Sequence, residues 1–319
     1  MISSFARVAF GVSLVVALPL VAAAKDKVRL VDSQATIFAH YAIYQAQSEG
    51  YYDAEDLDVS IIVGRGGADS LQAVVTGSQD MIFGTGILGV IGAYAKGAPV
   101  TIVASAVRGA KETIWLVKQD SPLKTLKDLD GKDFAYSAPG SLTHLVTQTL
   151  VRELGIKPKL VSTGNMSASR TQMMSGQTDT AWAGFPGGLD LVRAGEARIL
   201  GTADHPKINE LSMRVIAAHS GWLAKNREVA TRMMRAIWKG QQFNMSGEKA
   251  VARWAEHWKY TPEDAKDVYR YNAIDDLRFA PLGGLDTILA LAKEHDYIKE
   301  ALTEQEKKGL ATIVYDPGK

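Results

Sequence analysis

Apolar and polar positions along this chain follow two different periodicities. Short β-branched runs at 28–32, 59–63 and 81–83 predict strands. Between them, the stretches at 37–47 and 70–76 repeat their apolar residues every three or four positions and predict helices. Strands that alternate with helices form parallel sheets with helices on their faces. The pattern therefore predicts an α/β fold.

A second series of elements follows the first. Apolar runs at 100–104 and 113–117 predict two further strands, after which Gln119-Asp120-Ser121-Pro122 interrupts the pattern. A new strand at 134–136 then begins another alternating series. We expect the chain to enter a second lobe at this interruption and to return with a strand at 213–218. The predicted division is a first lobe of residues 25–118 and 213–319 and a second lobe of residues 119–212.

One unit is written twice in the sequence. Residues 72–84 and 172–184 share a plan in which a helix ends at a glycine, a polar turn with an aspartate follows, and an apolar run stops at another glycine. We interpret the two aspartates, Asp80 and Asp179, as turn-capping residues. Open α/β sheets bind ligands at the carboxyl ends of their strands. Two such units facing one gap would therefore form a clamp around a ligand.

The last third of the chain is predicted to be helical. Residues 227–243 and 249–258 carry apolar side chains at helical spacing, and Thr261-Pro262-Glu263 is typical of a helix start. Four tryptophans fall in this region at spacings that favour packing over ligand stacking, namely Trp222, Trp238, Trp254 and Trp258.

The N-terminus has the pattern of an export signal. Arg7 precedes an apolar core at 8–21, and Ala22-Ala23-Ala24 forms a small-residue cleavage site. The core is shorter than the roughly 20 residues that a membrane-spanning helix needs. We therefore expect a signal peptide of residues 1–24, cleaved after Ala24, and a mature protein in the periplasm that begins at Lys25.

Composition excludes several classes of protein and partner. The chain has no cysteine, which rules out disulfides and a lipid-modified cysteine at the cleavage site. Its 36 basic and 35 acidic residues nearly balance, without a block of one sign. Such a balance gives no indication of a nucleic-acid or membrane-surface partner. We expect a freely soluble protein, and a monomer.

The loop at 137–143 has the clearest chemical potential. Gly140 lets the backbone approach a ligand, and Ser141 and Thr143 supply hydroxyls at the predicted start of a helix over 144–154. The amides and dipole at a helix start favour negative charge, so an oxyanion would bind there. The alternative is that Ser141 only caps the helix.

A glycine motif and the histidines give little sign of cofactor chemistry or catalysis. Residues 84–89 match G-x-G-x-x-G, but the next strand ends at Ala104-Ser105 without the acid that holds a dinucleotide ribose. The six histidines, including His40 and His144, lack metal-ligand spacing, and no G-x-S-x-G or P-loop is present. We predict no cofactor, no metal and no catalytic residues.

Two arginines and a phenylalanine are further candidates. Arg65 and Arg108 lie near predicted strand ends, where each could pair with a carboxylate or sulfonate or could simply be exposed. Phe185 with Pro186 could give an apolar wall, with Trp182 behind it.

Several segments together point to a known group of proteins. In order along the chain, EGYYDAEDLDV, GGADSLQAVVTGSQD, SPLKTLKDLDGKDFAYSAPGS and MMSGQTDTAWAG resemble periplasmic binding proteins of ABC importers in the nitrate, sulfonate, taurine and thiamine-pyrimidine group. The resemblance covers nearly all of the mature chain. It implies a type II periplasmic binding protein fold, in which two α/β lobes joined by two crossings close over one small ligand and deliver it to an ABC permease in the inner membrane.

The resemblance also assigns ligand loops. Together with Arg108, the candidate ligand-binding residues are Ser33, Gln34, Thr36, Arg65, Gly66, Gly67, Thr85, Gly86, Ser137, Gly140, Ser141, Thr143, Asn165, Met166, Gly184 and Phe185.

Three functions remain open from the sequence. The first is capture of a small organic or inorganic anion without a chemical step. The second is binding of a thiamine-pyrimidine precursor, or an enzyme on the same fold. Related pyrimidine-synthesising enzymes depend on a cysteine-rich segment, and related deaminases depend on a cysteine that holds their cofactor; this chain has neither. The third is a sensor that contacts a membrane receptor kinase. Sulfonate, taurine, nitrate, pyrimidine and aromatic carboxylate ligands all fit, and the hydroxyls together with Phe185 favour an organic sulfonate or carboxylate.

Overall fold

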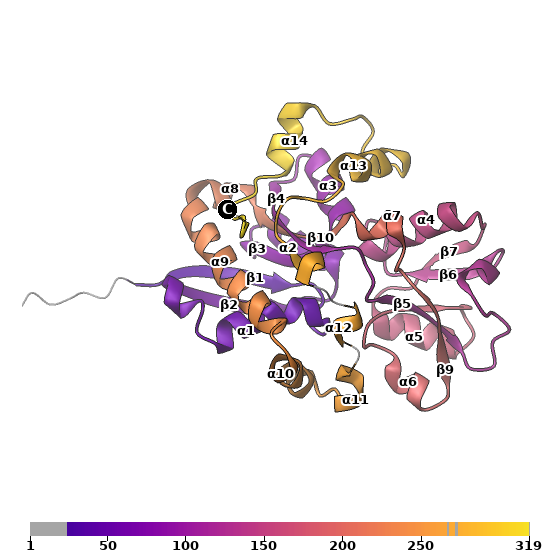
Figure 1. Cartoon of the computed structure of the whole chain (residues 1–319). Helices are drawn as coiled ribbons and strands as arrows, with labels where there is room; N and C mark the ends of the chain where they lie inside the picture. Colours follow the sequence, from indigo (N-terminus) through magenta and orange to yellow (C-terminus); the bar gives the residue numbers. More distant parts are fainter. Residues whose placement is uncertain (1–23, 267, 272–273, 319) are drawn as a thin grey trace, which may run out of the picture.

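Two α/β lobes face each other across a cleft in the computed structural model (Figure 1). The structure describes residues 24–266, 268–271 and 274–318. The predicted signal peptide therefore lies outside the described residues, except for Ala24. None of the helices described is both long and apolar enough to span a membrane.

The first lobe is built on a five-stranded sheet. Its strands are β1 (Asp26–Asp32), β2 (Leu57–Val63), β3 (Met81–Gly86), β4 (Val100–Arg108) and β10 (Ser212–His219), in the spatial order β2-β1-β3-β10-β4. β1 runs parallel to both neighbours, so that Leu30 pairs with Ile61 on one side and with Met81 on the other. β10 runs antiparallel to β3 and β4. The strands β3, β4 and β10 are almost wholly buried, as expected for strands covered on both faces.

Helices cover both faces of this sheet. They are α1 (Ala42–Ser48), α2 (Gly67–Val75), α3 (Ile87–Ala95), α8 (Ser220–Lys225) and α9 (Arg227–Asn244), with short 3-10 turns η1 (Phe38–Tyr41) and η2 (Asp53–Glu55). Successive side chains of a strand point to opposite faces. Leu30 therefore packs in one core with α1 and α9, and Val31 packs in the other with α2 and α3.

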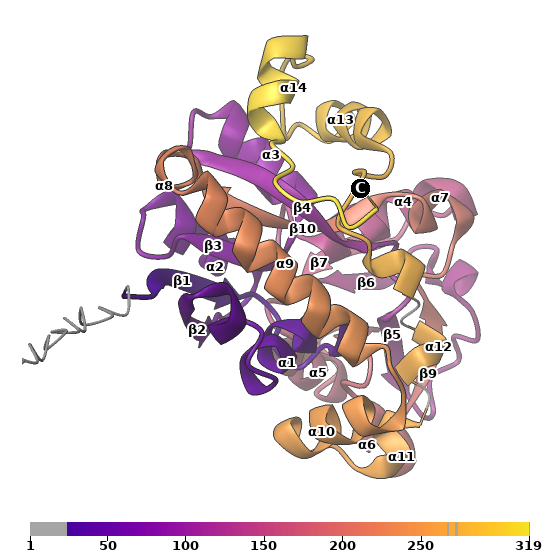
Figure 2. The same ribbon diagram turned by 60° about the vertical axis from the view of Figure 1, so that its left-hand side comes forward.

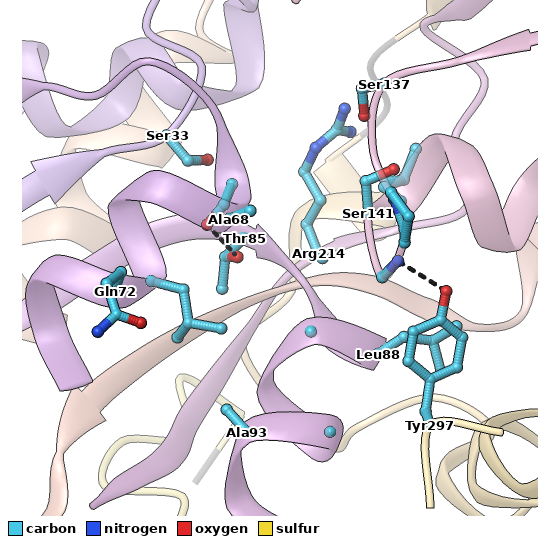
Figure 3. A pocket seen from close by; sticks show the side chains of 18 of the residues that line it. Ser33, Ala68, Gln72, Thr85, Leu88, Ala93, Ser137, Ser141, Arg214 and Tyr297 are labelled. Carbon is cyan, nitrogen blue, oxygen red and sulfur yellow. Dashed lines mark hydrogen bonds between the residues drawn. The ribbon is translucent and has the colours of Figure 1, made fainter. Parts of the chain in front are cut away.

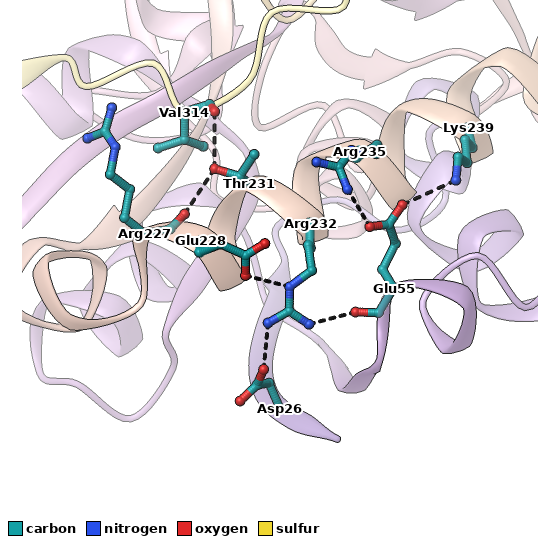
Figure 4. A network of polar contacts seen from close by, with 9 residues as sticks. All are labelled: Asp26, Glu55, Arg227, Glu228, Thr231, Arg232, Arg235, Lys239 and Val314. Atoms are coloured by element: carbon teal, nitrogen blue, oxygen red, sulfur yellow. Dashed lines mark hydrogen bonds and ion pairs between the residues drawn. The ribbon is translucent and has the colours of Figure 1, made fainter. Parts of the chain in front are cut away.

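Ion pairs fasten α9 to the edge of the first lobe (Figure 4). Arg232 contacts the Asp26 carboxylate at 2.5 Å and donates to the Glu55 carbonyl at 2.7 Å. Arg235 and Lys239 reach the Glu55 carboxylate at 2.6 and 3.2 Å. These contacts hold α9 against the start of β1 and against η2.

The second lobe repeats the strand order of the first. Its strands are β5 (Thr113–Lys118), β6 (Asp133–Tyr136), β7 (Lys159–Ser162), β8 (Ala181–Gly184) and β9 (Ala197–Thr202). β6 pairs with β7, and β5 pairs with β8 and β9. The Thr180 hydroxyl joins the two ladders, because it accepts from Ala135 N at 2.9 Å and donates to Asp133 O at 3.0 Å. The order β7-β6-β8-β5-β9 thus matches β2-β1-β3-β10-β4.

Helices flank this second sheet as well. They are α4 (Leu142–Leu154), α5 (Met166–Met174), α6 (Leu189–Arg193) and α7 (Pro206–Asn209), with a 3-10 turn η3 (Leu126–Leu129). The strand β7 was not predicted, since it is a short and only partly buried edge strand. Trp115 and Phe134 are buried between these elements, with ring centroids 4.9 Å apart.

Strand β5 corrects the predicted division between the lobes. The prediction assigned 113–118 to the first lobe, but Trp115 pairs with Trp182 and Gly201 in the second sheet. The chain therefore crosses between the sheets at 109–112 and returns at 203–211. An apolar β-branched run can pair in either sheet, and only long-range contacts decide which.

The duplicated unit has the same structure in both lobes. Gly77 and Gly176 end α2 and α5 with φ of 75° and 77°. The Asp80 carboxylate accepts from Arg29 N at 2.8 Å, and the Asp179 carboxylate accepts from Asp133 N at 2.9 Å. Both aspartates thus tie a turn to the neighbouring strand, which supports their structural interpretation.

The C-terminal part is helical, as predicted, and wraps the first lobe (Figure 2). It comprises α10 (Glu248–Trp258), α11 (Pro262–Ala265), α12 (Val268–Tyr271), η4 (Ile274–Leu277), α13 (Leu285–Glu294) and α14 (Glu304–Leu310). Thr261 caps α11 with a capping box. α13 contacts α3, and α14 contacts β4. Arg193 of α6 pairs with Asp264, so α11 also touches the second lobe.

The tryptophans of this region pack, as predicted, with one qualification. Trp254 is fully buried, and Trp222, Trp238 and Trp258 pack against apolar clusters. Trp258 also lines the cleft.

Candidate functional site

The cleft between the lobes holds two adjoining cavities of about 490 and 650 Å³. They share lining residues from both lobes, Ser33, Gln34, Gly67, Ala68, Ser137 and Ser141. These residues come from the end of β1, the start of α2 and the loop between β6 and α4. The cavities lie at the carboxyl ends of the strands, where the sequence placed the site (Figure 3).

The structure brings most of the predicted ligand residues together here. Those that line the cavities are Ser33, Gln34, Thr36, Arg65, Gly66, Gly67, Thr85, Gly86, Ser137, Gly140, Ser141, Thr143, Asn165 and Met166. Sequence segments more than 100 residues apart thus meet around one space.

Three predicted residues lie elsewhere. Arg108 donates to the Pro281 carbonyl at 2.7 Å and is outside both cavities. Phe185 is buried in a cluster with Phe38 and Trp254 instead of forming a cavity wall. Gly184 is also buried, and its amide donates to the Met166 sulfur at 3.2 Å. Each of the three is held by partners inside the fold, and none of them lines either cavity.

The loop at 137–143 is ordered by its own hydroxyls. Thr143 Oγ1 accepts from Ser137 N at 2.8 Å and lies 2.9 and 3.0 Å from the hydroxyls of Ser137 and Ser141. Ser141 also caps α4, since its Oγ accepts from His144 N at 3.2 Å. Capping and cavity lining are therefore combined in one residue, and neither interpretation excludes the other. The loop presents three hydroxyls at the positive end of a 13-residue helix.

The opposite wall is organised by a buried aspartate. Asp32 accepts from Gln34 N and from Tyr44 OH, each at 3.1 Å, and pairs with His40 Nδ1 at 2.6 Å. Burial raises the pKa of Tyr44 and the nearby Asp32 charge raises it further, so the phenol keeps its proton and donates. Ser33 Oγ donates to the Gly84 carbonyl at 3.0 Å. Asp32 thereby fixes the backbone that carries Ser33 and Gln34 to the cavity.

Two cations that the sequence analysis missed line the smaller cavity, an exposed Lys96 and a buried Arg214. The buried one, Arg214, lies on β10 and is 2% exposed. Its guanidinium pairs with Glu112 from the first crossing and donates to Gln34 Oε1 at 3.0 Å. Burial lowers the pKa of Arg214 to about 9, which leaves it charged at neutral pH. The signal in the sequence that could have identified it was a single arginine within the otherwise apolar predicted strand at 213–218.

Of the two arginines predicted from the sequence, Arg65 does line the cleft, at its rim. Arg65 has a side chain 89% exposed and pairs with Asp69 one helical turn on, at 3.5 Å. Such an exposed pair contributes little to stability. Arg65 can therefore move toward a ligand, whereas Arg214 is held in place.

Each glycine of the G-x-G-x-x-G motif has a different packing role. A β-carbon on Gly84 would lie 2.1 Å from the His40 ring, and one on Gly86 would lie 2.7 Å from Leu142 N. A β-carbon on Gly89 would lie 3.4 Å from the Gly140 carbonyl. The three glycines therefore leave room for the His40 ring and for the close approach of the second lobe. This packing explains the glycines without a bound dinucleotide.

The family of this chain is shown by a family profile that matches most of its length. The profile of the NMT1/THI5 like family matches residues 37–249, which include cleft loops of both lobes but not the one at 33–36. The chain belongs to the NMT1/THI5-like family. This membership confirms the resemblance expected from the sequence.

Solved structures place this NMT1/THI5-like chain in the periplasmic binding protein fold. The alkanesulfonate-binding protein SsuA from Xanthomonas axonopodis pv. citri, solved with MOPS, is 16% identical with a TM-score of 0.77, over 92% of this chain and 100% of that one. The periplasmic aliphatic sulphonate binding protein SsuA from Escherichia coli is 18% identical with a TM-score of 0.70, over 88% and 91% of the two chains. At these identities the likeness establishes the fold and confirms the predicted fold class.

Curated relatives of this NMT1/THI5-like chain include an enzyme. The 4-amino-5-hydroxymethyl-2-methylpyrimidine phosphate synthase THI11 of Saccharomyces cerevisiae is 27% identical over 120 residues, 38% of this chain. The match spans about a third of the length of the yeast protein, 34%.

Proposed function

We propose that this protein is the soluble periplasmic solute-binding component of an ABC importer and that it captures a small organic anion between its lobes without a chemical step. The observation that carries the proposal is a buried arginine, Arg214, facing a helix start with three hydroxyls across one cavity. Both elements favour a negatively charged group. The crossings at 109–112 and 203–211 would act as the hinge.

Apolar lining favours an organic ligand over nitrate. Leu71, Val75 and Leu88 line the same cavity as Arg214. A ligand with a compact anionic head and an aliphatic or aromatic portion would use both parts, because pockets combine apolar walls with few polar groups that set orientation. A sulfonate or carboxylate of this kind fits the cavity chemistry best.

A thiamine-pyrimidine precursor is the second candidate ligand, and a biosynthetic enzyme is the second candidate class. Family membership and the yeast synthases favour this alternative. The buried Asp32–His40 pair is a titratable pair near the cleft, but neither residue lines the cavities, and Gly84 packs over the His40 ring. Binding without turnover therefore remains the preferred proposal.

A ligand screen tests the proposal. The protein from Lys25 onward would be heated with methanesulfonate, longer alkanesulfonates, taurine, aromatic carboxylates, nitrate and an aminopyrimidine, since tight binding raises the apparent melting temperature by mass action. Titration calorimetry would then measure affinity for each hit. A shift with the pyrimidine alone would select the second candidate ligand, and loss of ligand detected by mass spectrometry would select the enzyme.

Variants then locate the site. The double variant Arg214→Gln with Glu112→Gln removes the buried charge without leaving a lone carboxylate. It should weaken anion binding about 10- to 100-fold, the range for losing a hydrogen bond to a charged group. Arg108→Gln is the matched control, because Arg108 lies outside both cavities. Equal affinities of the double variant and the control would refute the assigned role of Arg214.

A further inference from the structure

One side chain from the C-terminal segment reaches the ligand loop of the other lobe. Tyr297 follows α13 and rests on α3, where a β-carbon on Gly92 would lie 3.6 Å from the Tyr297 carbonyl. Its side chain lines the smaller cavity, and its hydroxyl points toward the loop that carries Ser141 (Figure 3). Tyr297 therefore belongs to the first lobe by its packing and to the second by its hydroxyl contacts.

The hydroxyl of Tyr297 completes a hydrogen-bonded chain. It accepts from Gly140 N at 2.6 Å and contacts His144 Nδ1 on the first turn of α4. Burial lowers the pKa of His144 to about 4 and raises the pKa of Tyr297, so at neutral pH the phenol keeps its proton and the neutral imidazole can accept it. The His144 ring stacks on Tyr136 of β6, with centroids 4.4 Å apart. The acceptor is thus held rigidly within the second lobe.

The surroundings are shaped for this contact. Gly140 has φ of 81°, and a β-carbon there would lie 3.3 Å from the Tyr297 ring. Glycine therefore suits both the backbone conformation and the approach of the ring. A second contact links the same two segments, because Glu294 at the end of α13 lies 3.2 Å from Arg152 of α4.

We propose that Tyr297 is a positioning residue that latches the ligand loop of the second lobe to the first lobe and favours the closed form before ligand arrives. The loop would then be preorganised, and less of the ligand's binding energy would go into closure. The latch also occupies the Gly140 amide, so a ligand would use the serine hydroxyls and Arg214 in its place. Only this last consequence rests on the proposed function.

The latch can be tested without any ligand. The chain has no cysteine, so Ser78→Cys and Gln177→Cys, at equivalent exposed positions of the duplicated turns, provide two unique sites for spin labels, one in each lobe. Pulsed electron paramagnetic resonance would measure the distance between them. Tyr297→Phe removes the hydroxyl and keeps the ring, and it should shift the ligand-free population toward a longer or broader distance distribution.

Two further variants make the test specific. Tyr269→Phe removes a hydroxyl that donates to Gly247 O at 2.8 Å, a contact between α12 and the turn before α10, and should leave the distances unchanged. His144→Asn removes the acceptor from the other side. Combined with Tyr297→Phe, it should open the lobes no further than the larger single effect, because both variants break one chain of contacts.

Affinity gives an independent outcome. For any ligand found by the screen, Tyr297→Phe should weaken binding about fivefold, the scale of one ordinary hydrogen bond lost from the closed form. Unchanged distances in the ligand-free Tyr297→Phe protein, or tighter ligand binding, would overturn the latch. Failure of every ligand to bind the unaltered protein would overturn the proposed function and leave the distance result standing.

Discussion

A β-carbon placed on Gly86 would lie 2.7 Å from the backbone nitrogen of Leu142. Gly86 ends β3 in the first lobe, and Leu142 begins α4 in the second. Gly86 has an ordinary backbone conformation, with φ of −63°, that any residue can adopt. Glycine is therefore required here by the approach of the lobes and by no local strain.

Gly86→Ala should keep the lobes from closing fully. We expect ligand affinity to fall at least tenfold, about 1.4 kcal/mol, because the added methyl group must be relieved by separating the lobes. Titration calorimetry with a ligand from the screen measures this change. Ser78→Ala, in an exposed turn of the first lobe outside both cavities, is the control. A Gly86→Ala protein with undiminished affinity would show that the lobes do not meet here when ligand is bound.

The buried Arg214–Glu112 pair should be strongly coupled in stability. Glu112→Gln leaves the Arg214 charge buried without its counter-ion and should reduce the free energy of unfolding by about 3 kcal/mol. The double variant with Arg214→Gln should lose less than the sum of the two single variants. Urea unfolding of the four proteins measures the coupling. Additive losses would mean that the pair contributes no interaction energy.

Stability should fall as the solution becomes acidic, in part through His144. Burial lowers the pKa of His144 from 6.5 to about 4, so the unfolded chain binds a proton that the folded protein excludes between these values. The contribution is therefore fully present above pH 6.5 and declines as the pH falls toward 4. We expect about 1 to 2 kcal/mol, since the half-buried ring is partly screened.

The measurement is urea unfolding at pH 7 and pH 4.5 in the unaltered protein and in His144→Asn. The difference between the two proteins removes the contribution of His295, whose pKa is also lowered by burial. Identical pH dependence in both proteins would contradict the assignment to His144.

Replacing the two duplicated aspartates should lower the free energy of unfolding by different amounts and should leave ligand affinity unchanged in both cases. Asp80 is 6% exposed in its side chain and accepts from the Arg29 backbone and guanidinium, so Asp80→Ala should cost about 2 to 3 kcal/mol. Asp179 is exposed and accepts from one amide, so Asp179→Ala should cost about 1 kcal/mol. Thermal unfolding measures both costs. A large loss of ligand affinity in either folded variant would contradict their structural role.

Local patterns predicted much of the fold and of the site. Period and capping signals predicted the elements of the first lobe, the capped start of α11 and the repeated turn at Asp80 and Asp179. They also predicted Ser33, Ser137 and Ser141 as cavity residues, because loops at the carboxyl ends of strands meet in one place in an α/β fold. These features depend on neighbours within a few residues or on the general topology of the fold.

The sequence by itself determined the two-lobed α/β plan, the duplication and the loops that border the cleft, since each is encoded by nearby residues. Only the tertiary structure decided that β5 pairs in the second sheet, that Arg214 enters the cavity beside Glu112, and that Tyr297 contacts Gly140. It also placed Arg108 and Phe185 outside the cavity. The physical reason is that these contacts join residues about 70 to 170 positions apart. No local periodicity or capping signal specifies which distant partner a buried charge, an apolar run or an aromatic side chain will meet.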